Sequence, residues 1–418
     1  MIINNPRTKF GGLLISKMKY YLLILLLITG CTNRSSDRSI NRPGDIQEIF
    51  IDVDQAEPIY MSDFFSGITY IPLKNPGKSP MGIITKIMPQ GNMIALYDRT
   101  KKSVWIYKEG GAFIGEVKIP EGKGPGELEH ISDVYFDEDF KIHVLGAFKI
   151  MTLNMNGNLI AESSMDLFAR YFTYDVNSNR YYGFGSGNSN VRIPDEFKGF
   201  DLFKFDDTGV IEKSFIPIEK NKQGISYGIP NYFPTFNGEY YFFKHLHDTV
   251  YKIEGDEVQP AYALDFGDYA LPDEVFERRK DYGNEIWQWT EFWDNEIEPY
   301  DYIVYKTNFE ITEKYIHMRV GNNDSKYMIL YHKDKKETYV GEDRFINDID
   351  FGPSPFIFMS SDKHLYSYVN ANDFLRHMNS VYESNRERYS SNRMIELRRL
   401  ANSMSENSNP VLMRLEFK

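Results

Sequence analysis

The stretch that decides the fold is residues 84–119, which read ITKIMPQGNMIALYDRTKKSVWIYKEGGAFIGEVKI. Short segments rich in β-branched and aromatic residues alternate here with turn-forming residues, which predicts strands joined by tight turns. The strand segments are 84–88, 93–97, 103–107 and 113–119. Four strands in so short a stretch correspond to one blade of a β-propeller.

A similar hairpin recurs along the chain. Each copy has apolar or aromatic strand ends around a polar turn, and it contains a glycine that can adopt positive φ. The glycines are Gly111, Gly157, Gly209 and Gly255. Their spacings of 46, 52 and 46 residues match the length of a four-stranded blade. A fifth hairpin over 330–338 and a sixth unit over 346–368 follow, so the sequence predicts six blades.

The fourth and fifth hairpins are separated by more than one blade length, which indicates an insertion over about 267–302. Pro272 followed by Asp and Glu is typical of a helix N-terminus, so we expect the insertion to be helical. Apolar residues at helical spacing also predict short surface helices within about 372–404.

The predicted fold class is therefore all-β, a six-bladed β-propeller over 46–418 with a helical insertion and short C-terminal helices. An open ring would leave unpaired strand edges, which invite aggregation. We expect 46–53 and 68–73 from the front of the chain to share the last blade with 411–417 from the back.

The N-terminal region has the pattern of a bacterial secretory signal. Lys17 and Lys19 form a basic start, and residues 22–28 form an apolar run that ends in small residues. The run is too short for a membrane-spanning helix, which needs about 20 apolar residues. A signal peptide is therefore predicted over 1–30, with Met18 as an alternative start.

The residues that follow the apolar run, Ile28-Thr-Gly-Cys31, resemble a bacterial lipobox. The resemblance implies cleavage after Gly30 and lipid attachment to Cys31. The polar stretch 31–45 would then be a lipidated tether. Thr32 after the cysteine resembles outer-membrane sorting, so the expected location is the bacterial cell envelope, lipid-anchored, on the outer membrane, with the periplasmic or external face left open.

Composition excludes several classes of protein. The 418 residues contain one cysteine, which rules out a disulfide framework and a cysteine-based zinc cluster. The 48 Lys and Arg against 60 Asp and Glu give a net charge of −12. Binding to nucleic acid needs a basic surface, so no nucleic-acid partner is expected.

Further motifs resemble one family. The run Gly122–Asp137 is similar to the blade junction of NHL-type propellers. A fuller resemblance is to six-bladed β-propeller lipoproteins related to NHL proteins, and it spans nearly the whole mature chain. The other motifs that carry it are Tyr-Ile-Pro-Leu at 70–73, Asp-Thr-Val-Tyr-Lys-Ile at 248–253 and Asn-Pro-Val-Leu at 409–412. The resemblance implies the fold, whereas the members' functions are mostly undefined.

The glycine-rich loop 122–127 invites comparison with a phosphate cradle. It lacks the Gly-Lys-Ser/Thr ending of a Walker motif, and its proline removes a donor, so an interblade turn is the main interpretation. Lys123 and His130 are nevertheless candidate ligand-binding residues at one mouth of the central channel.

His245 and His247 are weak metal candidates. If they lay on a strand, alternation would place both imidazoles on one face. A zinc or iron site needs at least one more ligand, and spacing identifies none. Histidines on the blade surface are the alternative interpretation.

The insertion holds the remaining candidate ligand-binding residues, Trp287, Trp289 and Trp293. Trp289 and Trp293 are four residues apart and would share a helical face. One interpretation is a lid helix whose rings pack on the propeller. The other is an aromatic platform that stacks on a sugar or contacts a peptide.

The favoured function is that of a membrane-anchored, non-catalytic module that binds a ligand or protein, such as a glycan or peptide, without a cofactor. No catalytic residue is identified, because the chain has no Gly-x-Ser-x-Gly motif and its only cysteine is assigned to lipid. The alternative is an NHL-like metal-dependent hydrolase or lyase that acts in the central channel. That function would need acidic, Asn or His side chains converging from several inner strands and a divalent metal.

Overall fold

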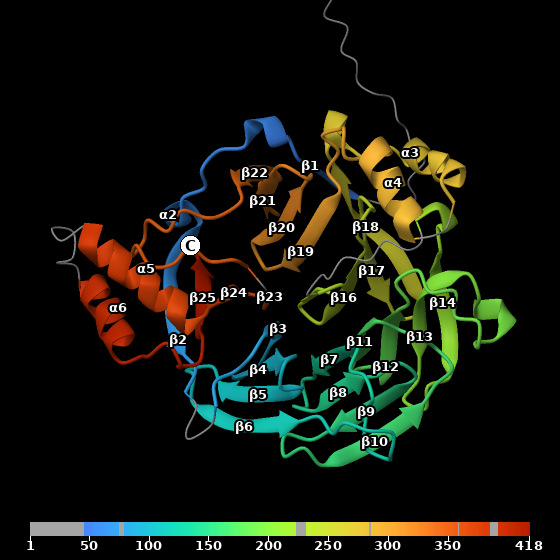
Figure 1. Cartoon of the computed structure of the whole chain (residues 1–418), viewed down its shortest axis with the longest axis horizontal. Coiled ribbons are helices and arrows are strands. Elements are labelled where there is room, and N and C mark those ends of the chain that lie inside the picture. Colours follow the sequence, from blue (N-terminus) through green and yellow to red (C-terminus); the bar gives the residue numbers. More distant parts are fainter. Residues whose placement is uncertain (1–45, 75–78, 223–230, 284–285, 358, 385–391) are drawn as a thin grey trace, which may run out of the picture. The chain divides into compact units, whose positions relative to one another are not determined.

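The computed structural model describes residues 46–74, 79–222, 231–283, 286–357, 359–384 and 392–418. Asp45–Lys418 forms one compact unit. Its described strands form six small sheets, here called sheets I to VI (Figure 1).

Sheets I to III each contain four consecutive antiparallel strands. Sheet I contains β3 (Ile84–Gln90), β4 (Met93–Asp98), β5 (Ser103–Lys108) and β6 (Phe113–Lys118). Sheet II contains β7 (Asp133–Phe136), β8 (Ile142–Leu145), β9 (Lys149–Leu153) and β10 (Leu159–Ser164). Sheet III contains β11 (Tyr171–Asp175), β12 (Arg180–Phe184), β13 (Phe200–Phe205) and β14 (Ile211–Pro217).

Sheets IV and VI each include a strand from the front of the chain. Sheet IV contains β15 (Thr235–Phe236), β16 (Glu239–Phe243), β17 (Thr249–Glu254), β18 (Glu257–Asp265) and β1 (Gln47–Phe50). Sheet V contains β19 (Tyr305–Ile311), β20 (Tyr315–Gly321), β21 (Lys326–His332) and β22 (Glu337–Glu342). Sheet VI contains β23 (Met359–Ser360), β24 (His364–Val369), β25 (Val411–Phe417) and β2 (Phe65–Pro72).

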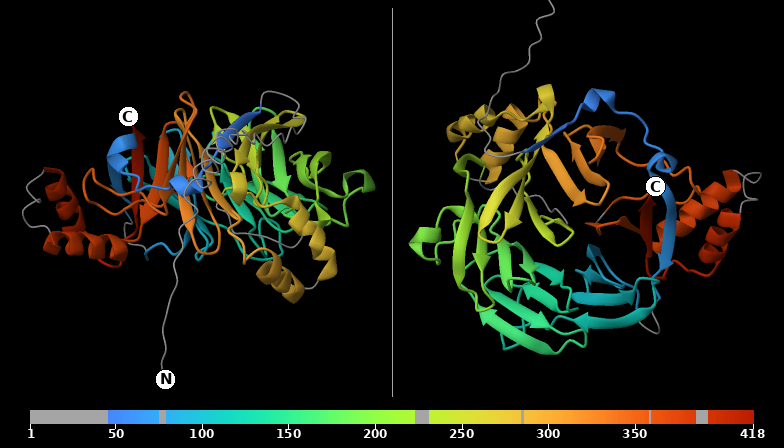
Figure 2. Two further views of the ribbon diagram at one scale, coloured as in Figure 1. Left: turned by 90° about the horizontal axis from the view of Figure 1, so that it is seen from above. Right: turned by 180° about the vertical axis from the view of Figure 1, so that it is seen from behind.

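Apolar packing joins the sheets in cyclic order. Separate clusters of buried side chains lie between sheets I and II, II and III, III and IV, IV and V, V and VI, and VI and I. Innermost strands of neighbouring sheets also touch: β3 and β7, β7 and β11, β15 and β19, β19 and β23, and β23 and β3. The sheets surround a common axis in Figure 1, and Figure 2 shows the same body from above and from behind. The all-β class is confirmed, and the arrangement is propeller-like.

The hairpin glycines behave as the sequence predicts. Gly111, Gly157, Gly209 and Gly255 have φ values of 83°, 81°, 84° and 59°. This left-handed backbone costs little only for glycine, which explains why the residue recurs in these turns.

The predicted closure is correct for sheet VI and wrong for the first strand. β2 and β25 pair as neighbours, with Ile68 opposite Leu415. β1, however, pairs in parallel with β18 in sheet IV, with Gln47 opposite Tyr262. The connection from β1 to β2 runs along the edge of sheet V, where a bridge joins Glu57 to Gly341. The front of the chain therefore covers parts of two other sheet edges before it reaches sheet VI.

Helices lie outside the ring of sheets. The insertion contains α3 (Asp273–Glu277) and α4 (Ile286–Glu296) beside β18, whereas α5 (Ala371–Ser384) and α6 (Asn392–Asn402) lie beside β2 and β25 (Figure 1). A single-turn helix, α2 (Met61–Phe64), precedes β2. Short 3-10 turns are η1 (Val53–Gln55), η2 (Asp195–Phe197), η3 (Lys220–Lys222), η4 (Gly267–Tyr269) and η5 (Arg278–Asp281).

Candidate functional site

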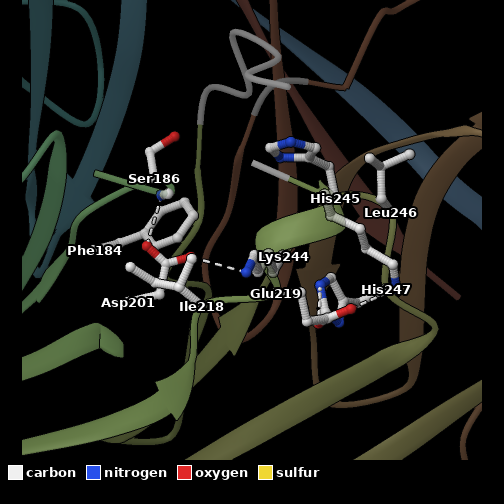
Figure 3. A pocket seen from close by; sticks show the side chains of 11 residues that line it. Phe184, Ser186, Asp201, Ile218, Glu219, Lys244, His245, Leu246 and His247 are labelled. Carbon is white, nitrogen blue, oxygen red and sulfur yellow. Dashed lines mark hydrogen bonds and ion pairs between the residues drawn. The ribbon is translucent and has the colours of Figure 1, made fainter. Parts of the chain in front are cut away.

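A pocket lined by charged side chains lies between sheets III and IV (Figure 3). Its cavity volume is about 20 Å³, which is room for about one water molecule. One wall comes from the end of β12 and the start of β13, and the other comes from the turn after β16 and the segment after β14. The polar side chains of the lining are Ser186, Asp201, Glu219, Lys222, Lys244, His245 and His247.

Asp201 and Lys244 form a buried ion pair across this pocket. The Lys244 Nζ lies 2.8 Å from Asp201 Oδ2, and both residues are buried. The other carboxylate oxygen, Oδ1, accepts a hydrogen bond of 2.7 Å from the Gly187 N–H. Buried charges need such partners, because an unpaired one would be strongly destabilising. The pair therefore fixes the ammonium group at the pocket wall.

Glu219 connects a second set of charges. Its Oε1 lies 2.9 Å from His247 Nε2, and its Oε2 lies 2.7 Å from Lys222 Nζ. Burial opposes ionisation of Glu219, but hydrogen bonds and charges from His247 and Lys222 outweigh it and lower its pKa to about 2. Burial lowers the pKa of His247, although Glu219 opposes this shift. At neutral pH the Glu219 carboxylate therefore accepts hydrogen bonds from the neutral imidazole of His247 and from the ammonium group of Lys222.

His245 faces a different partner from His247. Its Nδ1 lies 3.1 Å from the Tyr232 hydroxyl, and the two imidazoles point apart in Figure 3. β16 ends at Phe243, so both histidines lie in the turn after the strand and do not share a face. Leu246 between them has a φ of 59°, which breaks the alternation that the sequence suggested.

The pocket has two non-glycine residues in the left-handed region. Ser186 on one wall has a φ of 55°, and Leu246 on the other has a φ of 59°. Such conformations cost free energy for residues with a Cβ, and they persist only where the surroundings impose them. Here the Gly187 N–H, next to Ser186, donates to Asp201, and Leu246 is packed in the apolar cluster of the insertion.

Aromatic packing joins the pocket to the inner strands. The Tyr232 ring lies 4.4 Å from the Tyr171 ring and 4.9 Å from the Phe184 ring, measured between centroids. Tyr171 belongs to β11, the innermost strand of sheet III. Aromatic rings therefore connect the pocket to the innermost strand of sheet III.

A second buried ion pair lies on the inner strands of sheets I and II. Lys86 Nζ contacts Asp133 Oδ1 at 2.9 Å, and the exposed fractions of the side chains are 8% and 10%. Asp133 Oδ2 accepts from the Phe172 N–H of sheet III at 3.1 Å. One aspartate, Asp133, thus connects three neighbouring inner strands.

Glu310 on β19 adds a fourth inner strand to this central network. Its Oε2 accepts hydrogen bonds of 2.8 Å from both the N–H and the hydroxyl of Ser360, and its Oε1 accepts one of 3.3 Å from Asn231. Burial raises the pKa of Glu310 to about 7, although these hydrogen bonds and the charge of Lys86 oppose the rise. The carboxyl group can therefore change protonation state near neutral pH.

The polar residues here do not assemble a metal site. Among the described residues, no three His, Cys, Asp or Glu side chains are grouped closely enough to hold a metal ion. His245 and His247 are divided between Tyr232 and Glu219, so this pair does not fit a common ion.

The tryptophans of the insertion pack on its own apolar cluster. Trp289 and Trp293 are partly buried against a group that includes Phe292, Phe276 and Leu246. The Arg279 guanidinium lies 3.4 Å from the centroid of the Trp289 ring. Trp287 is different, because 64% of its surface is exposed.

Lys123 and His130 lie on the loop between sheets I and II and are exposed. The Lys123 ammonium pairs with Glu129 at 3.1 Å, and its side chain is 81% exposed. In the loop, the N–H of Gly124 donates to the Glu127 carboxylate, so this N–H is not available to a phosphate.

Cys31 lies outside the described residues. No helix among the described residues is long and apolar enough to cross a membrane.

Sequence reasoning missed the buried charged residues of the centre and of the pocket. They are Lys86, Asp133, Asp201, Lys244 and Glu310. Lys86 had a recognisable signal, because it is the single charge in an otherwise apolar or polar-neutral strand segment, whereas Glu310 shares its strand with Lys306. Their mutual proximity had none, since they come from opposite ends of the chain.

Comparisons with known proteins identify the family and the fold. A family model described as a domain of unknown function, DUF4934, matches residues 47–416. A structure from Bacteroides fragilis NCTC 9343, designated an exported protein, is similar with a TM-score of 0.69 and 16% identity, covering 90% of this chain and 100% of that one.

Two further structures are only slightly similar. A DUF4221 family member from Bacteroides vulgatus has a TM-score of 0.43 and 12% identity over 85% of this chain and 97% of that one. A protein of unknown function from Bacteroides thetaiotaomicron has a TM-score of 0.38 and 9% identity over 84% and 76%. No curated protein matches the chain.

Proposed function

The chain belongs to the DUF4934 family, and from this premise we propose that it is a lipid-anchored protein of the bacterial cell envelope whose six-bladed β-propeller binds a small polar ligand without transforming it. The six sheets would be the blades, related to those of NHL propellers. The anchor would be Cys31, and the outer membrane would be its location. The exported designation of the similar B. fragilis protein agrees with this location.

The observation that carries the binding proposal is the pocket of Figure 3. Charged side chains from two sheets face one cavity, and each is held by a partner before any ligand arrives. Groups fixed in this way lose little freedom on binding, which favours affinity. Ammonium, imidazole and carboxylate groups offer both donors and acceptors. A cavity of this size fits a single polar group of a ligand, such as a hydroxyl of a sugar or the end of a peptide.

Ligand binding can be tested on residues 32–418, which include the whole compact unit. We expect at least one member of a panel of mono- and disaccharides and dipeptides to raise the melting temperature. Lys244→Met should abolish the increase, because it removes a donor from the pocket wall. Lys213→Met, an exposed lysine of sheet III, is the matched control and should leave the increase unchanged. An increase that survives in Lys244→Met would exclude this pocket.

The anchor needs a separate test. Cells that express the full chain would be labelled with an alkyne fatty acid. We expect incorporation into the wild-type protein and none into Cys31→Ser. Incorporation that persists in Cys31→Ser would contradict the lipobox assignment.

A second candidate function is hydrolysis or elimination at the axis. Glu310 favours it, because a buried carboxyl group with a pKa of about 7 can donate or accept a proton at neutral pH. Lys86 and Asp133 would supply fixed charges beside it. Under this alternative, Glu310→Gln should abolish turnover of the bound ligand, whereas under the main proposal no turnover exists to be lost.

A further inference from the structure

A groove lies away from the charged pocket, between the edge of sheet IV and the edge of sheet V. It has a volume of about 700 Å³. The connection after β1 and the strand β22 form much of its lining. Four of the lining residues are Phe50, Phe64, Tyr331 and Tyr339, and Phe50 is 55% exposed. Phe50 therefore offers aromatic surface to a partner, whereas Phe64 and Tyr331 are buried.

The charge of the groove is strongly negative. Its acidic lining residues are Glu48, Asp52, Glu57 and Asp63, and the basic one is Lys336. Glu57 and Asp63 are exposed, and no ion pair to either occurs within the part of the chain that the structure describes. A cationic occupant would gain attraction from these carboxylates without first breaking an internal pair.

Backbone groups of β22 also face the groove. The Glu57 N–H donates to the Val340 carbonyl at 3.1 Å, so Val340 directs its backbone groups to the outer edge of sheet V. Because this direction alternates along a strand, Thr338 faces the same edge. Thr338 lies opposite Tyr331 in the register of β21 and β22, and among the described residues no backbone bond joins it to the connection after β1. The connection after β1 thus covers the second half of this edge and leaves the first half available.

The opposite wall repeats the pattern. Ile51 donates its N–H to the Asp265 carbonyl, so Ile51 directs its backbone groups to β18. Phe50, the preceding residue, therefore directs its own backbone groups away from β18. An extended segment in the groove would meet a strand edge on each side.

We propose that this groove is a docking site for an extended, Lys- or Arg-rich segment of a partner protein, which adds as a strand to the edge of β22. Backbone hydrogen bonds would give affinity, and the alternating basic side chains would reach Glu57 and Asp63. This site is separate from the ligand pocket, so it does not depend on the proposed function.

The test is fluorescence anisotropy with residues 32–418 and a labelled peptide of ten alternating lysines and threonines. We expect saturable binding that Glu57→Lys with Asp63→Lys weakens by at least about tenfold. The matched control reverses two exposed acids elsewhere, Glu196→Lys with Glu298→Lys. The control should change the affinity by less than about twofold, because neither residue lines the groove and exposed charges at a distance are screened by salt.

An N-methylated version of the same peptide separates strand addition from simple charge attraction. It keeps every lysine but cannot donate backbone hydrogen bonds, so we expect it to bind at least about tenfold more weakly. Equal binding of this peptide, equal weakening by the control pair, or no binding to the wild type would overturn the proposal. A dimer of the free chain that Glu57→Lys with Asp63→Lys dissociates would overturn it too, by identifying a second copy as the occupant.

Discussion

The central polar network and the tryptophan-containing insertion over about 267–302, here called the rim, both adjoin sheet IV. They are built in opposite ways. The centre receives isolated charged residues from separate strands, such as Lys86, Asp133 and Glu310. The rim is one contiguous insertion in which Phe292 and its aromatic neighbours pack together. The comparison teaches that the most conspicuous motif in a sequence can be structural, whereas the unusual chemistry can come from residues that are scattered along it.

The largest expected effect is at the centre. Lys86→Met leaves Asp133 buried with its backbone hydrogen bonds alone. We expect the free energy of unfolding to fall by about 3–5 kcal/mol, because breaking a buried pair leaves an uncompensated charge. Urea denaturation measures the change. Lys118→Met, an exposed lysine at the end of β6, is the control. A loss no larger than that of the control would show that the pair is unimportant.

Sequence reasoning located the strands well because strand patterning and turn glycines are local signals. Gly111 and Gly255 mark hairpins in both the sequence and the structure. The partner of the first strand was not a local signal, since Gln47 pairs with Tyr262 far along the chain. The central network could not be predicted for the same reason. The sequence does not show that Lys86 and Glu310 lie near each other, because only the fold brings their strands together.

A substitution in the rim should destabilise mainly the insertion itself. Phe292 is fully buried, so Phe292→Ala should cost about 3 kcal/mol through lost burial and a cavity. We expect the insertion to unfold before the sheets, because it has its own apolar cluster. Tryptophan fluorescence should then show an earlier transition in urea than circular dichroism. Coincident transitions would mean that the insertion and the sheets form one cooperative unit.

The pH dependence of stability sharpens the description of the centre. The folded-state pKa of Glu310 is about 7, above its ordinary value of 4.5. The folded state therefore holds the proton more tightly, so stability falls as pH rises from about 4.5 to 7. Glu310→Gln should remove about 2 kcal/mol of the loss between pH 5 and pH 8. A curve that is identical to the wild type would place the titration elsewhere.

His317 on β20 provides a contrast, because it is a buried titratable group outside the central network. Burial lowers its pKa from 6.5 to about 3. The unfolded chain gains a proton first, so stability falls as pH drops below 6.5. His317→Leu should therefore remove about 2 kcal/mol of acid destabilisation at pH 5 relative to pH 8. His377→Leu, at a half-buried histidine on α5, is the comparison variant. Equal effects of the two would contradict the assignment.

The smallest expected effect is at Trp287. Its side chain is 64% exposed, so Trp287→Ala should change the free energy of unfolding by less than about 0.5 kcal/mol. Urea denaturation in parallel with Phe292→Ala measures the difference. A loss similar to that of Phe292→Ala would remove the distinction between the exposed and packed rings of the insertion.

The most direct test of the central claim is an NMR experiment on residues 32–418 with a mixed pool of mono- and disaccharides and dipeptides. Saturation transfer reports which members bind, and the same spectra over one day report whether any is converted. The account predicts saturation transfer to at least one member, its loss in Lys244→Met, and no new resonances. New resonances that depend on Glu310, or no saturation transfer to any member, would contradict it.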